Sequence, residues 1–239
     1  MNGIILAIET SGDGGGAAVF LNGELDNQAE VSGPRRHGAE LMKCVDKTCI
    51  DAAISRDQID VIAVNCGPGS YTGLRIGLAT AAALGFALDR PVIGVPAFDA
   101  MVMQYVSRED FDVSLRRELW PCLDARRDEV MTARFVYADG RMVRASDDML
   151  VAPEKLHEQA AHQAIIFGSG VKPYEDRFTH ENLFVDKVEF EIKPGSIAMH
   201  AWRQLAEIED AKTIERKPVE PRYFRRVLAK TIAERASEV

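Results

Sequence analysis

The chain has 239 residues, of which 46% are hydrophobic and 28% are charged, and its formal net charge is −8. This length allows one large domain or two small ones, and the apolar content excludes a disordered chain. The acidic balance argues against autonomous binding to the phosphate backbone of a nucleic acid.

The first elements in the chain are predicted to be three antiparallel strands. Residues 3–8 form an apolar run typical of a buried central strand. A Ser/Gly-rich turn leads to a second strand at 17–21, and Asn22-Gly23 is a strong hairpin signal before a third strand that ends near Val31. The N-terminus has no basic region of a signal peptide, so we expect a soluble, cytoplasmic protein.

Helices and strands then alternate. Apolar residues spaced by three and four predict a helix over 37–54, and Ser55 begins a capping-box pattern with Gln58. A strand is expected at 60–66, and the 67–73 loop then leads into a helix that ends at Leu88. Another strand is expected at 91–95, and another helix after Pro96. The order β-β-β-α-β-α-β-α is that of one half of the actin-like, or ribonuclease H-like, α/β fold. The apolar stretch Leu74–Leu88 is too short to span a bilayer.

The second half is predicted to be a smaller, degraded copy of the first. Strand signals recur at 119–123, 130–137, 142–145 and 164–167, a helical stretch follows Pro153, and another helix runs from Pro194 to Ile208. The expected organisation is a first subdomain at 1–103, a second at 104–211 and a tail at 212–239. The tail carries eight basic and four acidic side chains, a net charge of +4.

Five motifs resemble those of the TsaB family. The longest is residues 65–80, NCGPGSYTGLRIGLAT. The others are IETS at 8–11, HGAEL at 37–41, LDARR at 123–127 and PRYFR at 221–225, so the resemblance covers most of the chain.

The resemblance implies a non-catalytic accessory subunit in the formation of threonylcarbamoyladenosine, next to the anticodon of tRNAs. In that family the subunit scaffolds and activates a catalytic paralogue, TsaD, which holds the metal. A small ATPase, TsaE, joins them, and the subunit interacts with tRNA through the complex. Two alternatives stay open at this stage: an active actin-like ATPase or kinase, and a stand-alone homodimeric binding module.

Candidate residues for a vestigial nucleotide or anion site lie in two turns. The Gly67–Gly73 loop enters a helix N-terminus, whose free N–H groups attract anions, but it matches neither the P-loop nor G-x-G-x-x-G. The candidates are Thr10, Ser11, Asp13, Gly69, Ser70 and Thr72. Glu9 stands where the family usually has Asp. We expect no required cofactor, and leave open weak ATP or ADP binding at a subunit interface.

Residues for catalysis and for metal binding are not found in the sequence. His157 and His162 are five apart, which places them on different sides of a helix, and His37, His180 and His200 stand alone. No G-x-S-x-G elbow occurs. The four cysteines lack CxxC spacing and are expected to be buried, reduced thiols.

The helix ending at Leu88 is apolar almost all round. Its small residues Gly73, Gly77, Ala81 and Gly85 recur every four positions, which suits close approach of another helix. We therefore predict that this helix and the 37–54 helix form a partner interface; a helix enclosed by its own fold is the alternative. The predicted partner-binding residues are His37, Leu41, Val45, Arg75, Gly77, Leu78, Ala81 and Gly85.

Aromatic and basic residues alternate near the C-terminus. Tyr223, Arg225 and Arg226 are candidate RNA contacts. Docking of this segment onto the protein's own body fits the pattern equally well.

Overall fold

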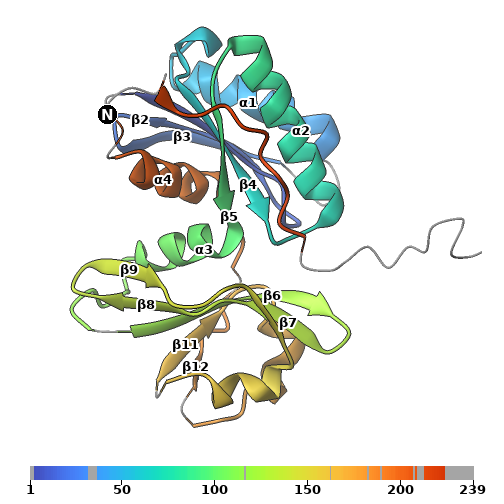
Figure 1. Ribbon diagram of the computed structural model, residues 1–239, viewed down its shortest axis with the longest axis vertical. Coiled ribbons are helices and arrows are strands. Elements are labelled where there is room, and N and C mark those ends of the chain that lie inside the picture. Colours follow the sequence, from blue (N-terminus) through green and yellow to red (C-terminus); the bar gives the residue numbers. More distant parts are fainter. Residues whose placement is uncertain are drawn as a thin grey trace, which may run out of the picture.

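The computed structural model describes residues 3–31, 37–115, 117–161, 163–181, 183–188, 190–206, 208 and 213–223. Two sheets form two halves, and one helix lies between them (Figure 1). The α/β architecture predicted from the element order is confirmed.

The first sheet has the strand order β3-β2-β1-β4-β5. Its strands are β1 (Ile4–Glu9), β2 (Gly16–Leu21), β3 (Glu24–Glu30), β4 (Val61–Gly67) and β5 (Val92–Pro96). The first three are antiparallel, while β1, β4 and β5 are parallel, as apolar runs buried on both faces require. Parallel strands end at the same edge, so the turn after β1 and the loop after β4 lie side by side.

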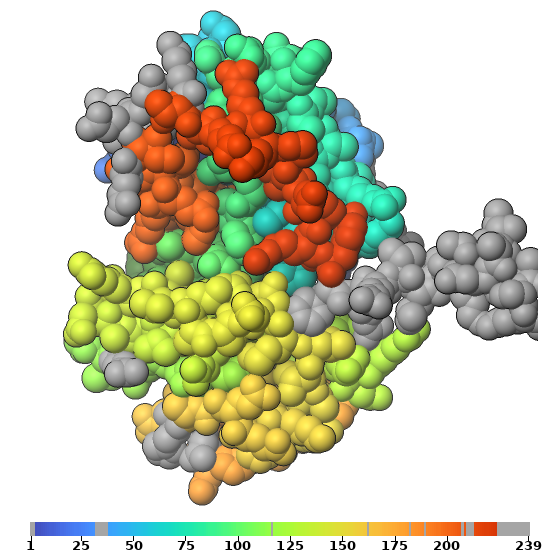
Figure 2. All heavy atoms as spheres, in the orientation of Figure 1, coloured from blue at the N-terminus to red at the C-terminus, as the bar shows by residue number. Residues whose placement is uncertain are grey.

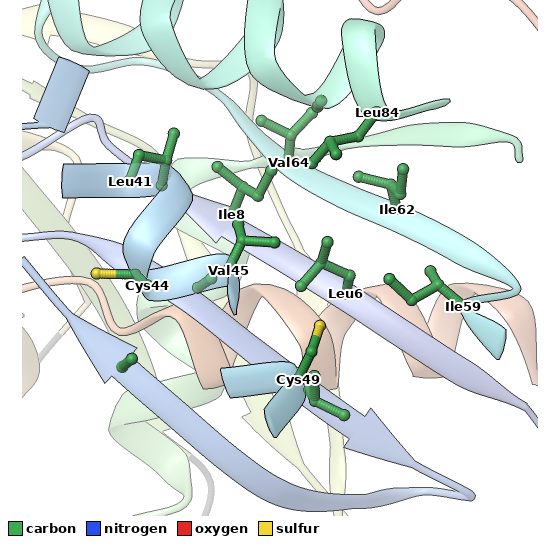
Figure 3. Packing of buried hydrophobic residues seen from close by; sticks show 14 of the residues in the cluster. Leu6, Ile8, Leu41, Cys44, Val45, Cys49, Ile59, Ile62, Val64 and Leu84 are labelled. Carbon is green, nitrogen blue, oxygen red and sulfur yellow. The ribbon is translucent and has the colours of Figure 1, made fainter. Parts of the chain in front are cut away.

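Helices cover both faces of this sheet. On one face, α1 (His37–Asp51) packs mainly on β2 and β3, and α2 (Tyr71–Leu88) packs mainly on β4; Figure 3 shows side chains of α1 and of the strands in one cluster. The other face carries α3 (Ala97–Val106) and α4 (Pro194–Leu205). The predicted capping box is present where Ser55 precedes a short 3-10 helix at Arg56–Gln58.

The second sheet has the strand order β10-β7-β6-β11-β12, and β8 and β9 extend it beside β6. Its bounds are β6 (Arg117–Arg126), β7 (Glu129–Thr132), β8 (Phe135–Ala138), β9 (Arg141–Arg144), β10 (Met149–Val151), β11 (Ala164–Phe167) and β12 (Leu183–Val185). The 3-10 helices Pro153–Glu158 and Lys172–Arg177 flank β11. The strands β10 and β12 were not predicted from the sequence.

The prediction of a single strand at 130–137 is wrong, because β7 and β8 are two separate strands along the same edge of β6. The ladder is interrupted at Arg134, whose backbone N–H donates to Ser146 Oγ at 2.8 Å. A backbone donor turned away from the neighbouring strand ends the pairing there.

The expected subdomain ranges also need correction. Although α4 falls within 104–211, its residues Ile197, Ala198 and Ala201 are buried against the first sheet. The expected boundary at 103/104 falls inside α3, because Phe98 and Met101 pack into the second half and Ala100 packs under the first sheet. The two halves therefore share α3, and the chain returns to the first half after β12.

Residues 213–223, the C-terminal strap, cross the first half between α4 and α2 (Figure 2, red). Val219 fills the space left by Gly94, where an added Cβ would lie 2.6 Å from Val219 Cγ1. The backbone N–H of Arg222 donates to Cys66 O at 2.7 Å, and its guanidinium lies 3.7 Å from Asp148 of the second half. The strap thus contacts both halves.

One described helix, Tyr71–Leu88, is long and apolar enough to cross a membrane by length and composition, because it begins three residues before the apolar stretch at 74–88. One third of this helix is buried within the protein. A helix with one side packed on its own sheet satisfies the same criterion.

His200, on α4, is an unsatisfied buried group. Neither ring nitrogen has a hydrogen-bond partner among the described residues. Burial lowers the pKa of His200; Asp99 opposes this shift, and Arg203 and Arg144 reinforce it. Protonation inside the fold is therefore disfavoured relative to the unfolded chain.

We expect the free energy of unfolding to fall as the pH is lowered from 7 to about 5.5, because the unfolded chain binds this proton more readily. His200→Phe should flatten this part of the stability profile in urea titrations, and His157→Phe is the matched control. An identical slope in wild type and His200→Phe would rule out His200 as its source.

Candidate functional site

A cleft of about 1110 Å³ lies between the two halves. The first half contributes the turn at 11–14 and the loop at 69–73, and the second half contributes the end of β6 and the residues around Gly168. The topology explains this position, because the parallel strands β1 and β4 end at the same edge of the first sheet.

Five of the six residues predicted for nucleotide or anion binding line this cleft: Ser11, Asp13, Gly69, Ser70 and Thr72. The sixth, Thr10, is buried beneath it, and its hydroxyl donates to Gly73 O at 2.8 Å. Thr10 therefore ties β1 to the first turn of α2. The structure brings the two predicted turns together.

A buried polar network supports the turn at Ser11. The Glu9 carboxylate accepts hydrogen bonds from Ser11 N and Asn65 Nδ2, and Asn65 Nδ2 also donates to Ser11 Oγ at 2.8 Å. Burial raises the pKa of Glu9, and these donors oppose the shift. The role of Asn65 was missed from the sequence, where it reads only as a polar residue at the end of a buried strand.

Two of the backbone N–H groups that could hold a phosphate are already engaged. Ser70 N donates to Ser11 O at 2.8 Å, and Gly73 N donates to Ser70 Oγ at 3.3 Å. The Glu191 carboxylate lies against Gly14, where an added Cβ would be 2.5 Å from Glu191 Oε2. A phosphate that used these two N–H groups would have to displace these contacts and approach a carboxylate.

The charges in the cleft do not favour a free nucleotide either. Four carboxylates (Asp13, Asp124, Glu175 and Glu191) and three cations (Arg126, Lys172 and Lys187) line it, above the buried Glu9. Asp124 already accepts from Tyr174 Oη at 3.0 Å and from Arg126 N at 2.7 Å. Within the described ranges there is no group of three His, Cys, Asp or Glu residues that could hold a metal.

The structure shows where most of the histidines and all of the cysteines lie. The sequence predicts that His180 stands alone, and this prediction is wrong: its ring stacks on that of His157, with 4.4 Å between the ring centroids. His162 and the side chain of His37 lie outside the described residues. All four cysteines are buried and free, as predicted, and burial raises the pKa of Cys66 to about 11.

The predicted partner interface is wrong for the small flank of α2. Gly77, Ala81 and Gly85 are buried against the first sheet. An added Cβ would lie 2.4 Å from Thr10 Oγ1 at Gly77 and 2.4 Å from Val92 Cγ2 at Gly85. The small residues do permit close approach, but by the strands of the same chain.

Leu41 and Val45 of α1 are also core residues, 2% and 0% exposed. Leu78 is half-buried and Arg75 is exposed. The opposite face of α2 is open and apolar: it carries Ala79 and Ala82, and Phe86 is 92% exposed. Because the whole helix is apolar, its periodicity did not indicate which face turns outward.

Tyr223 lies on the first turn of α2, outside the cleft. Its ring centroid is 4.9 Å from that of Tyr71, and its hydroxyl accepts a hydrogen bond from Arg75 Nε at 3.0 Å. The C-terminal segment therefore docks onto the body of the protein, one of the two alternatives left open. Arg225 and Arg226, the other predicted RNA contacts, lie outside the described residues.

Comparison with known proteins places this architecture in a family. The family model described as TsaD, tRNA N6-adenosine threonylcarbamoyltransferase, matches residues 30–190. Proteins named TsaB, a tRNA threonylcarbamoyladenosine biosynthesis protein, are similar over nearly the whole chain. The Haemophilus influenzae protein is 26% identical and covers 92% of this chain and 93% of its own, and the Escherichia coli protein is 24% identical with 94% and 96% covered. The chain belongs to the TsaD family, in its TsaB group.

A solved structure supports the fold of this TsaB-group chain. YeaZ from Pseudomonas aeruginosa superposes with a TM-score of 0.75 at 23% identity and covers 92% of this chain and 98% of its own. A second Pseudomonas aeruginosa structure, described as similar to peptidase YeaZ, has a TM-score of 0.77 at 24% identity, with 93% and 100% covered. In the present chain, the described residues lining the cleft include neither histidine nor cysteine.

Proposed function

We propose that this chain is a non-catalytic accessory subunit in the formation of threonylcarbamoyladenosine next to the anticodon of tRNAs. It would scaffold and activate a TsaD-type catalytic subunit in the cytoplasm. A TsaE-like ATPase would join this complex, and the chain would interact with tRNA through the assembled complex. Family membership supports the pathway, and the site geometry supports the accessory role.

The observation that carries the accessory role is the state of the cleft. Ser70 N and Gly73 N are engaged within the fold, and Glu191 lies against Gly14. Catalysis of phosphoryl or acyl transfer needs free donors aimed at the developing charge. We therefore infer that the chain requires no cofactor of its own, and that any ATP or ADP binds weakly, at a subunit interface.

The open face of α2 supports a scaffolding role. Phe86 is 92% exposed and lies on the same helical face as Ala79 and Ala82. Ile50 of α1, 74% exposed, adds a second large apolar side chain on the side of the first sheet that α1 and α2 cover. Exposed apolar surface of this kind is typical of protein interaction sites. We propose this outer face of α2, rather than its small flank, as the contact for the catalytic subunit.

Reconstitution tests the proposal. We expect the purified chain alone neither to hydrolyse ATP nor to modify tRNA, and we expect omission of it from a mixture with its TsaD-type and TsaE-like partners to abolish threonylcarbamoyladenosine formation. Mass measurement of the mixture should show a complex with the TsaD-type subunit.

The competing functions give different results. Magnesium-dependent ATP turnover that is lost in Asp13→Ala or Asp124→Ala would indicate an active ATPase. A stable homodimer that does not bind the TsaD-type protein would indicate a stand-alone binding module.

A further inference from the structure

The C-terminal strap ends in a cluster of three side chains on the first turn of α2. The guanidinium of Arg75 lies 4.1 Å from the ring centroid of Tyr71, and its Nε donates to Tyr223 Oη at 3.0 Å. The two tyrosine rings are 4.9 Å apart. We call these residues the Tyr71–Arg75–Tyr223 cluster; 148 positions separate Arg75 from Tyr223 in the chain.

The cluster is open to solvent although its members contact one another. Tyr71 and Tyr223 are 42% and 37% exposed, and they are the two most exposed of the five tyrosines. The Nη atoms of Arg75 make no hydrogen bond or ion pair with any described residue. Tyrosine and arginine with free surface are the residue types that contribute most to binding at protein interfaces.

The strap holds Tyr223 in place before any partner arrives. Val219 is packed into the space above Gly94, and Arg222 N is bonded to Cys66 O at 2.7 Å. Both contacts lie within five residues of Tyr223. Ordering the ring in advance reduces the entropy lost when a partner binds.

The cluster is continuous with the apolar face of α2. Tyr71, Arg75, Ala79, Ala82 and Phe86 are separated by steps of four, four, three and four, so they lie along one side of the helix. Arg75 is the only charged residue of α2. A surface for RNA needs several cations to neutralise phosphates, whereas a protein partner needs apolar contact with few charges.

We infer that the C-terminal strap is part of the docking face for the TsaD-type subunit, with Tyr223 as an anchor residue; this inference rests on the proposed function. The segment of the partner that fits places apolar side chains along α2 and a carboxylate opposite the Nη atoms of Arg75. Tyr223, which the sequence suggested as an RNA contact, then serves protein recognition.

The test is a titration of the full-length chain with its TsaD-type partner, with the dissociation constant as the readout. Tyr223→Ala should weaken binding by about tenfold or more, the usual effect of losing an anchor residue. Tyr223→Phe keeps the ring and should lose much less. Tyr174→Ala, which removes a tyrosine beside the cleft of the second half, is the matched control and should leave binding unchanged.

Two further measurements separate the outcomes. Hydrogen exchange across 217–223 should slow when the partner is added to wild type. Val219→Ala, which loosens the strap but keeps the ring, should weaken binding less than Tyr223→Ala; an equal loss would assign the effect to strap order alone and overturn the anchor role.

Normal binding by Tyr223→Ala alongside loss of binding by Phe86→Asp would overturn the inference and leave the proposed function intact. Normal binding by both variants would also overturn the proposal that the outer face of α2 contacts the TsaD-type subunit. Should Tyr223→Ala keep its partner affinity but reduce tRNA binding by the assembled complex, the ring contacts RNA and the inference is wrong.

Discussion

Gly77→Leu is expected to lower the free energy of unfolding by about 3 kcal/mol or more, the upper range for overpacking a core. Gly77 faces β1 and β4, and even a Cβ there would lie 2.4 Å from Thr10 Oγ1 and 3.5 Å from Val64 Cγ2. Thr10 has little freedom to move, because its hydroxyl holds Gly73 O. The leucine side chain must therefore push α2 away from the sheet.

Ala82→Leu is the matched control, because it adds the same side chain to the exposed face of the same helix. It should change stability by no more than about 0.5 kcal/mol, as most surface substitutions do. Urea titrations followed by circular dichroism compare the two variants. Equal stability of Gly77→Leu and wild type would mean that α2 does not pack on the sheet through its small flank.

The second large effect is expected on assembly. Phe86→Asp replaces the most exposed large apolar side chain of the described chain by a carboxylate, and should weaken binding to the TsaD-type subunit by roughly 30-fold or more. Two causes act together: the apolar contact is lost, and a charge without a partner must be desolvated in the interface. The fold should be unaffected, because the ring of Phe86 is 92% exposed.

Phe184→Asp provides the comparison. Phe184 is 59% exposed on β12 of the second half, so this variant makes the same chemical change at a distant apolar site. Complex formation followed by light scattering or calorimetry should be lost for Phe86→Asp and retained for Phe184→Asp. The reverse result would place the partner contact on the second half.

The element order of the first half could be predicted from the sequence because its signals are local. An uninterrupted apolar run over 5–8, the Asn22-Gly23 turn and the stripe of α1 each depend on neighbouring residues. The turns that carry Ser11 and Ser70 could also be identified locally, whereas their meeting in one cleft depends on β1 and β4 being parallel neighbours that end at the same edge of the sheet. The second half was harder to predict: its strands are as short as three residues, and the interruption at Arg134 depends on Ser146, twelve positions away.

The tertiary structure decided what the sequence left ambiguous. An α2 that is apolar on nearly every side has no polar face to mark the outside, so only its packing shows that the glycine flank contacts the first sheet and that Phe86 faces outward. The same holds for Tyr223, whose aromatic and basic neighbours suit RNA as well as protein until the strap places it on Tyr71 and Arg75. Local sequence determines which elements form, and contacts between distant segments determine which of their faces remain free to bind.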